Sequence, residues 1–337
     1  MNNFCKIEES VELARKKISM LRKDDSLVFP MFTDLHTVDS DHEFMDRLTF
    51  ALEYISKKIP CDAVINLGDI FEMLGRNIHI TNDELKKRFE RVLTVIHEAS
   101  KVPVINVNGN HDGIGTDFFK QDFWNSIVKG KCGNAMAVYG DEGSYYYIDY
   151  EKSNTRLVIL SVPCDSDLEC DMPTPLWRFG KHQLEWLKNT ALNTTKDVII
   201  LSHVPFYDKY TGDKEATLGV WDGEKERVSY ISALCGGIED VEDSVAILKE
   251  FDGQHNARLV AVLSGHTHED DVLLPREEKD GFRNPLPCTQ LVTAATCHYS
   301  GIERTVGISL DIVVWTPSEN KLHMIRIGDG EDRLISI

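Results

Sequence analysis

Apolar runs and stretches with helical spacing alternate through the first hundred residues of this chain. Residues 26–33, 63–66 and 102–107 are mostly apolar runs of the length of buried strands. Between them, residues 43–59 and 83–99 carry apolar side chains every three or four positions, which is the period of an amphipathic helix. Strands that alternate with helices in this way predict a layered α/β domain with a mostly parallel sheet.

The same alternation continues through the middle of the chain and then changes character. Further strand-like runs and one helical stretch occupy residues 145–148, 157–162, 181–192 (the helix), 198–201 and 259–263. The last strand-like runs, at residues 290–293, 306–315 and 321–327, have no helical pattern between them. We therefore expect a second, more antiparallel sheet near the C-terminus.

One long segment interrupts the pattern without dividing the chain. Residues 208–256 contain several glycines and many charged residues between two predicted strands, and we expect them to be an insertion or a lid over the substrate. No linker rich in Pro, Gly or Ser separates one part of the chain from another. The sequence therefore predicts a single domain over residues 1–337, with its core at about residues 26–327.

Charge narrows the classes of partner. The chain has 55 acidic residues against 37 lysines and arginines, a formal net charge of -18. A surface this acidic repels polyanions, which argues against long nucleic acid and against anionic membranes as partners. A small phosphate-ester substrate remains compatible with it, because bound metal cations offset part of the negative charge. The sequence leaves the oligomeric state open.

The cysteines and the N-terminus predict a cytoplasmic protein. None of the eight cysteines lies in a CxxC pair, and their scatter along a long chain is typical of reduced thiols rather than of a disulfide framework. Charged residues run through positions 1–19, where a signal peptide needs a continuous apolar stretch. No apolar run approaches the roughly 18 residues that span a bilayer.

Polar motifs stand at the ends of five predicted strands. They are Asp34-Leu35-His36, Gly68-Asp69, Gly109-Asn110-His111-Asp112, His203 and Gly265-His266-Thr267-His268. In open α/β sheets, ligands bind at the carboxyl ends of the strands, so these five motifs would converge on one place. Taken singly, each motif has an ordinary structural reading as a turn, a cap or a core histidine. Seven such coincidences in one order are not a credible alternative.

The residue types in these motifs suit a transition metal. Extended residues at positions i and i+2 point the same way, so Asp34 and His36 can hold one ion together, as can His266 and His268. The two oxygens of Asp69 can bridge two ions. Imidazole nitrogens with carboxylate and amide oxygens fit Zn, Mn or Fe, and the number of histidines argues against Ca or Mg.

The order DxH, GD, GNHD, H and GHxH resembles the calcineurin-like metallophosphoesterase family, from Asp34 to His268. The resemblance implies a four-layer α/β/β/α sandwich of mixed sheets with helices outside. It also implies two divalent transition-metal ions, which would be Mn, Fe or Zn. By position in the motifs, the ligands of one metal are Asp34, His36, Asp69 and His268, and those of the other are Asp69, Asn110, His203 and His266. His111 would reach the substrate phosphate or the leaving oxygen, and Asp112 would orient it.

The activity that this resemblance implies is hydrolysis of phosphate esters by attack of a metal-bridging hydroxide on phosphorus. Glu72 stands where purple acid phosphatases have a tyrosine, and the arginines of the protein phosphatase motifs are missing around Asp69 and Asn110. The GNHD form is common among phosphodiesterases of the family, so we expect phosphodiesters as substrates. The alternatives are a phosphomonoesterase or protein phosphatase, a nuclease, and a catalytically silent protein-binding scaffold.

Overall fold

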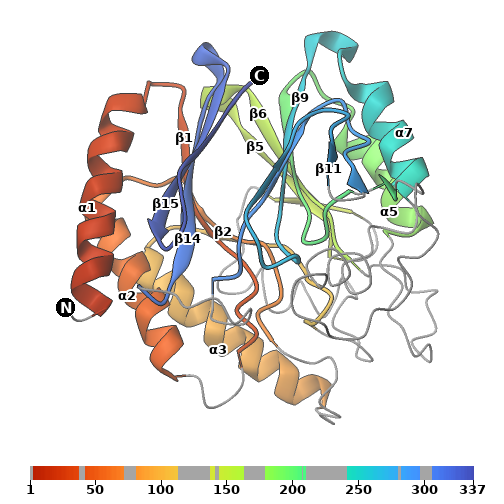
Figure 1. Cartoon of the computed structure of the whole chain (residues 1–337). Coiled ribbons are helices and arrows are strands. Elements are labelled where there is room, and N and C mark those ends of the chain that lie inside the picture. Colours follow the sequence, from red (N-terminus) through yellow and green to blue (C-terminus); the bar gives the residue numbers. More distant parts are fainter. Residues whose placement is uncertain are drawn as a thin grey trace.

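Two β-sheets lie face to face between two layers of helices in the computed structural model of the chain (Figure 1). The structure describes residues 3–37, 42–71, 81–112, 137–140, 144–162, 179–206, 208–209, 241–279, 282–296 and 306–337. Helix, sheet, sheet and helix follow one another across the molecule. This arrangement confirms the predicted α/β/β/α sandwich.

The first sheet combines three N-terminal and three C-terminal strands among the described residues. Its order is β16 (Arg333–Ser336), β15 (Lys321–Gly328), β14 (Ser309–Thr316), β1 (Leu27–Phe32), β2 (Val64–Asn66) and β3 (Val104–Asn106). Strands β1, β2 and β3 are parallel, whereas β14 runs antiparallel to β1 and begins an antiparallel group with β15 and β16.

The second sheet has a parallel centre and antiparallel edges. Its order in the described residues is β10 (Asp271–Leu273), β13 (Thr289–Val292), β9 (Leu259–Ser264), β7 (Asp197–Leu201), β6 (Thr155–Ile159), β5 (Tyr146–Tyr150) and β4 (Val138–Tyr139). Strands β13, β9, β7 and β6 are parallel to one another. A small separate sheet contains β11 (Glu278–Lys279), β12 (Phe282–Arg283) and β8 (Asp208–Lys209).

Helices cover the outer face of each sheet (Figure 1). The first sheet is covered by α1 (Asn3–Leu21), α2 (His42–Lys58) and α3 (Asn82–Ser100), and the second by α5 (Lys181–Trp186), which continues into a π-helical turn (Leu187–Ala191), and by α7 (Val241–Phe251). Short 3-10 turns occupy Glu151–Ser153, Gln254–Asn256 and Pro317–Glu319. No described helix combines the length and the apolar character that crossing a membrane requires.

Three apolar cores hold these layers together. One lies between the first sheet and its helices, a second lies between the two sheets, and a third lies between the second sheet and α5 and α7. Strand β14 shows how the layers are assigned, because its side chains alternate between two cores. Ile312 and Val314 pack toward the helices, whereas Val313 and Trp315 pack between the sheets.

The C-terminal strands correct one prediction. They do not form a second sheet of their own, because β14 pairs along the whole of β1, from Leu27 opposite Trp315 to Met31 opposite Asp311. Every residue of β14 is buried, so this strand needs cover on both faces and lies inside the first sheet. Strand β13, which we expected beside β14, instead joins the second sheet next to β9.

Within the segment at residues 208–256, the structure describes β8 at its start and residues 241–256 at its end. Val245, Leu248 and Phe251 of α7 pack into the core under the second sheet, so this part is a covering helix rather than a lid. The rest of the segment that we expected to be an insertion or a lid, residues 210–240, lies outside the described residues. The described cysteines, Cys5, Cys61 and Cys288, are free thiols.

Candidate metal centre

The polar motifs meet at the carboxyl ends of β1, β2, β3, β7 and β9, and backbone hydrogen bonds tie their loops together. The Asp34 N–H donates to the Gly68 carbonyl at 2.9 Å, and the His36 N–H donates to the Asp69 carbonyl at 3.0 Å. On the second sheet, the Gly265 N–H donates to the His203 carbonyl at 3.0 Å. These bonds tie together the loops within each sheet, and the His266 N–H joins the two sheets by donating to Asp34 Oδ2 at 3.0 Å.

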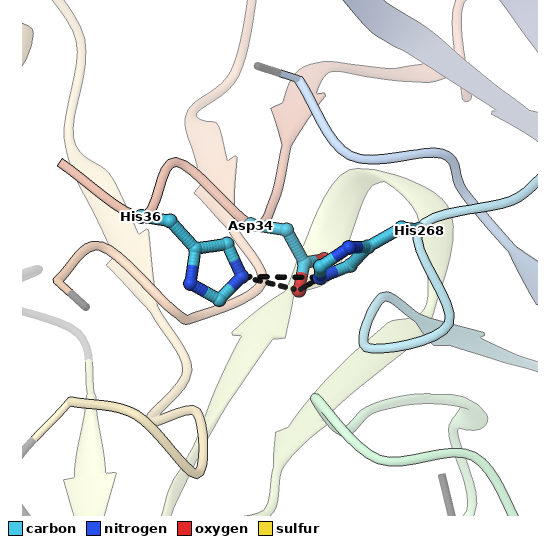
Figure 2. A group of neighbouring side chains, drawn as sticks. All are labelled: Asp34, His36 and His268. Atoms are coloured by element: carbon cyan, nitrogen blue, oxygen red, sulfur yellow. Dashed lines mark hydrogen bonds and ion pairs between the residues drawn. The ribbon is translucent and has the colours of Figure 1, made fainter. Parts of the chain in front are cut away.

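Asp34, His36 and His268 form the first group of candidate ligands, and Figure 2 shows their side chains pointing toward one another from two loops. The Nε2 atoms of His36 and His268 lie 3.1 Å apart. Asp34 Oδ1 lies 3.2 Å from His268 Nε2 and 3.6 Å from His36 Nε2. The other oxygen, Asp34 Oδ2, accepts hydrogen bonds from the Thr33 hydroxyl at 2.7 Å and from the His266 N–H at 3.0 Å.

Asp69, His203 and His266 form the second group. Asp69 Oδ2 lies 3.0 Å from His203 Nε2 and 3.8 Å from His36 Nε2, so this oxygen stands between the two groups. Asp69 Oδ1 accepts the His111 N–H at 2.8 Å. The His203 and His266 rings are 5.2 Å apart between centroids.

A backbone carbonyl that the sequence analysis did not consider fixes the tautomer of His203. His203 Nδ1 lies 2.9 Å from the carbonyl oxygen of Leu67, which can only accept a hydrogen bond. In the neutral ring, Nδ1 therefore carries the hydrogen, and the lone pair is on Nε2, which faces Asp69. The carbonyl belongs to the backbone just after β2. Its position therefore depends on the path of the backbone, and no side-chain motif in the sequence indicates it.

The spacing of these atoms fits shared metal ions. Ligand atoms that are each about 2.0–2.2 Å from one ion stand roughly 3.0–3.6 Å from one another in tetrahedral or octahedral geometry. The separations in the first group, 3.1, 3.2 and 3.6 Å, lie in that range. Asn110 adds an independent sign, because its Oδ1 is buried and accepts no hydrogen bond from the described residues. A buried acceptor without a donor is costly unless a cation binds there.

The backbone at this site is strained. Asp34, His36, Asp69, His266 and His268 all have positive φ angles, of 51°, 42°, 54°, 73° and 61°. Non-glycine residues in this left-handed region cost on the order of 1–3 kcal/mol each and persist where the surrounding structure imposes them. This strain falls on five candidate ligands. The fold therefore accepts an unfavourable backbone conformation there, and with it the side-chain directions that bring the ligands together.

Two glycines allow the loops to approach one another. A Cβ on Gly109 would lie 2.0 Å from Asp69 Oδ1, and a Cβ on Gly265 would lie 2.1 Å from the Thr33 hydroxyl oxygen. Both separations are impossible for real atoms. The glycines of the GNHD and GHxH motifs are therefore needed for contact between loops.

Mutual attraction sets the charge state of the metal-free site. Burial alone would raise the pKa of Asp34, but the facing His203 and His268 lower it well below the usual range. The pKa of Asp69 is lowered in the same way by His203 and His111. Burial alone would lower the pKa of His203, but Asp69 and Asp34 raise it to about 9. Burial and the charge of His203 lower the pKa of His266 to about 3.

His111 lies beside the second group with the most accessible side chain among these ion-pairing histidines. Its Nε2 is 4.0 Å from Asp69 Oδ2, and its ring meets the His36 ring edge to face at 4.7 Å between centroids. The side chain is 21% exposed, against 0% for His203 and 1% for His36. This exposure allows His111 to meet a bound molecule that the buried ligands would reach only through an ion.

Asp112 acts differently from our prediction that it orients the His111 ring. Its carboxylate accepts four backbone hydrogen bonds, from the N–H groups of Asp69, Ile70, Phe71 and Gly109, at 2.7–3.2 Å. Local turns bring all four donors toward one carboxylate. Asp112 therefore fixes the loop that carries Asp69, and it positions His111 through the shared GNHD backbone. Burial and the nearby Asp69 charge raise the pKa of Asp112 to about 7.

Comparisons with known proteins bear on the family and on the fold. The family model described as calcineurin-like phosphoesterase matches residues 31–270. The solved structure of PhoD is similar at a TM-score of 0.52 and 12% identity, covering 92% of this chain and 68% of that chain, which supports the fold alone. The structure of GAP50, the anchor in the inner membrane complex of Plasmodium, is similar at a TM-score of 0.45 and 14% identity, covering 93% of this chain and 89% of that chain. No protein with a curated description matches the sequence.

Proposed function

Because the chain belongs to the calcineurin-like phosphoesterase family, we propose that it hydrolyses small phosphodiesters with two divalent transition-metal ions, Mn, Fe or Zn. The observation that carries this proposal is the position of Asp69 between two groups of candidate ligands. Its Oδ2 stands 3.0 Å from His203 and 3.8 Å from His36. A single carboxylate shared in this way is suited to two ions rather than one.

Most residues of the site would hold the metal ions, and the ions would activate the nucleophile. Asp34, His36 and His268 would hold one ion, and Asn110, His203 and His266 the other, with Asp69 common to both. Ions bound there would polarise a water molecule into a nucleophile and offset the charge of the phosphate. The carbonyl of Leu67 and the hydroxyl of Thr33 keep His203 and Asp34 turned toward the ions.

His111 is the proposed catalytic residue. It lies next to Asp69 with an accessible ring, so it can donate a proton or a hydrogen bond to the oxygen that leaves phosphorus. Its backbone N–H is fixed to Asp69 Oδ1, and the Asp112 carboxylate fixes the adjoining loop. The ring is thus placed by the same hydrogen bonds that place the shared ligand.

The motifs support a diester substrate rather than a phosphoprotein. The loop around Asp69 and the GNHD motif lack the arginines that protein phosphatases of this family carry. A diester has one negative charge on its phosphate where a monoester has up to two, and the net charge of -18 repels the monoester more. A cytoplasmic location is part of the proposal, supported by the free thiols of Cys5, Cys61 and Cys288.

Two measurements test this proposal. Elemental analysis after anaerobic reconstitution should find two transition-metal ions per chain. The loaded protein should then hydrolyse bis-p-nitrophenyl phosphate faster than p-nitrophenyl phosphate, and His111→Ala should lower the rate about a hundredfold to ten-thousandfold with unchanged metal content. One ion at saturation would contradict the two-metal proposal. Hydrolysis of the monoester alone would contradict the preference for diesters.

A further inference from the structure

We propose that Arg326 and Arg333 are positioning residues that clamp Asp270 and thereby hold the loop carrying His266 and His268 in its metal-binding shape. The inference rests on the proposed function and adds residues to it. The matched family region ends at residue 270, whereas both arginines lie beyond it, on β15 and β16. The C-terminal strands would then contribute to the metal centre without supplying a ligand.

Asp270 is the point where the ligand loop meets these strands. It follows His268 by two residues, and its Oδ1 is an ion-pair partner of both Arg326 Nη2 and, at 3.0 Å, Arg333 Nη1. The same oxygen accepts the Ala294 N–H at 3.0 Å. One carboxylate oxygen thus connects the ligand loop to β15, β16 and the end of β13.

A second carboxylate keeps both arginines in place. On β14, Asp311 Oδ1 lies 3.1 Å from Arg326 Nε, and its Oδ2 lies 2.5 Å from Arg333 Nη2. The Thr293 hydroxyl also donates to this carboxylate. Two positive and two negative side chains therefore form one compensated cluster.

The burial of both arginines makes this cluster sensitive to the loss of a carboxylate that faces them. The side chains of Asp311, Arg326 and Arg333 are 0%, 2% and 9% exposed, and that of Asp270 is 30% exposed, so the two arginines and Asp311 carry most of the buried charge. Removing one partner of a buried ion pair leaves an uncompensated charge, which is far more disruptive than losing an exposed pair. The backbone also closes over the cluster, because a Cβ on Gly330 would lie 3.1 Å from Asp270 Oδ2.

The ligand loop needs to be held at both ends. His266 and His268 occupy left-handed backbone conformations, with φ angles of 73° and 61°, that a free loop would leave. Gly265 holds the first end, through its N–H on the His203 carbonyl and its close approach to Thr33. The clamp on Asp270 holds the other end, so the direction of the two imidazoles depends on it.

The test compares metal binding with folding. Asp270→Asn keeps the shape of the side chain and removes the charge that both arginines face. We expect the variant to remain folded by circular dichroism and to bind Mn²⁺ about tenfold to a hundredfold more weakly, the usual effect of losing a support of metal ligands. The visible absorption of the Co²⁺-loaded protein should change shape, since it reports the geometry of the ligands.

A second variant and a control separate positioning from general stability. Arg333→Gln should weaken metal binding in the same way, and it carries the test if Asp270→Asn does not fold. Asp197→Asn is the matched control, because Asp197 pairs with Arg258 at 2.5 Å at the opposite end of β7 and β9. It should lower the melting temperature and leave metal affinity and the Co²⁺ spectrum unchanged.

The outcomes distinguish the clamp from the proposed function. Wild-type affinity and an unaltered Co²⁺ spectrum in both clamp variants would overturn the positioning role and leave the two-metal proposal standing. A wild-type chain that binds no transition metal would overturn both.

Discussion

At the scale of single residues, Asp69 is the side chain that lies between the first and second groups of candidate ligands. Its Oδ2 faces His203 and His36, and its Oδ1 is occupied by the His111 N–H. Asp69→Asn keeps one oxygen but removes the negative charge between two cations, whose repulsion is then poorly offset. We expect this variant to lose at least one metal and nearly all activity, while circular dichroism shows an intact fold.

Asn110→Ala is the comparison for that prediction. It removes a neutral oxygen that faces one ion only, so metal titration should show a smaller loss than in Asp69→Asn. Wild-type affinity for both ions in Asp69→Asn would show that the carboxylate is not shared, and the two-metal arrangement would have to be abandoned.

His203 links metal binding to pH. In the metal-free protein, Asp69 and Asp34 raise the pKa of His203 to about 9, so the ring holds a proton at neutral pH. That proton must leave before Nε2 can bind a metal. Apparent metal affinity should therefore rise with pH, about tenfold per unit up to pH 9, with close to one proton released. Calorimetry in buffers of different ionisation enthalpy measures this release, and a titration without proton release would refute it.

The same raised pKa of His203 makes the stability of the metal-free protein fall as the pH rises, whereas metal affinity increases with pH. The protonated ring stabilises the metal-free fold fully below the unfolded pKa of 6.5, and this contribution is lost as the pH rises through about 9. Thermal melts of metal-free protein across that range should show the decline. Metal-loaded protein should not show it, because its His203 carries no proton to lose.

The convergence of the candidate ligands could be predicted from the sequence, but the contacts around them could not. Asp34, His36, Asp69, Asn110, His203, His266 and His268 all follow strands, and strand ends converge by a general rule of α/β sheets. The partners of Asp112 include backbone groups some 40 residues away, and those of Asp270 include Arg326, 56 residues away. Such distant contacts leave no local spacing to recognise.

At the scale of elements, the loops of the site touch through glycine. A Cβ on Gly109 would overlap the Asp69 carboxylate, at 2.0 Å from its Oδ1. Gly109→Ala should therefore displace Asp69 and reduce the metal content to one ion per chain or fewer, measured by elemental analysis.

Gly253→Ala is the control for that change. A Cβ at Gly253 meets nothing within 4 Å, although its φ of +80° makes alanine strained. It should cost roughly 1–2 kcal/mol of stability and leave the metal content unchanged. Full metal content in Gly109→Ala would show that the two loops can separate without consequence for the site.

Helices and strands were predicted well where the apolar residues follow a clear helical or strand pattern. They were predicted poorly where a strand pairs with another that lies far away in the sequence. Strand β1 and helix α3 lie within one or two residues of their predicted bounds. The partner of β14 could not be read from its sequence, because a strand that is buried on both faces fits equally well in either sheet. Helix α7 was missed because its four buried positions follow a long stretch of glycines and charges.

At the scale of the whole molecule, metal removal should weaken the fold. Asp34, Asp69 and Asp112 are buried together in a chain of net charge -18, and bound cations offset that concentration of charge. Each ion present at a hundred times its dissociation constant adds about 2.7 kcal/mol to the stability, so two ions add about 5.4 kcal/mol. We expect chelation to lower the melting temperature by roughly 8 °C, and to have less effect on Asp69→Asn. Equal melting temperatures with and without chelator would contradict this prediction.

The left-handed conformations of Asp34, His36, Asp69, His266 and His268 also bear on how this chain evolves. Glycine at any of them would relieve backbone strain, so a change to glycine there would gain backbone stability and lose the side chain. A lineage that no longer used the site would have no force holding these residues in place and would replace them early. Side chains at all five strained positions are what we expect of a chain that uses them.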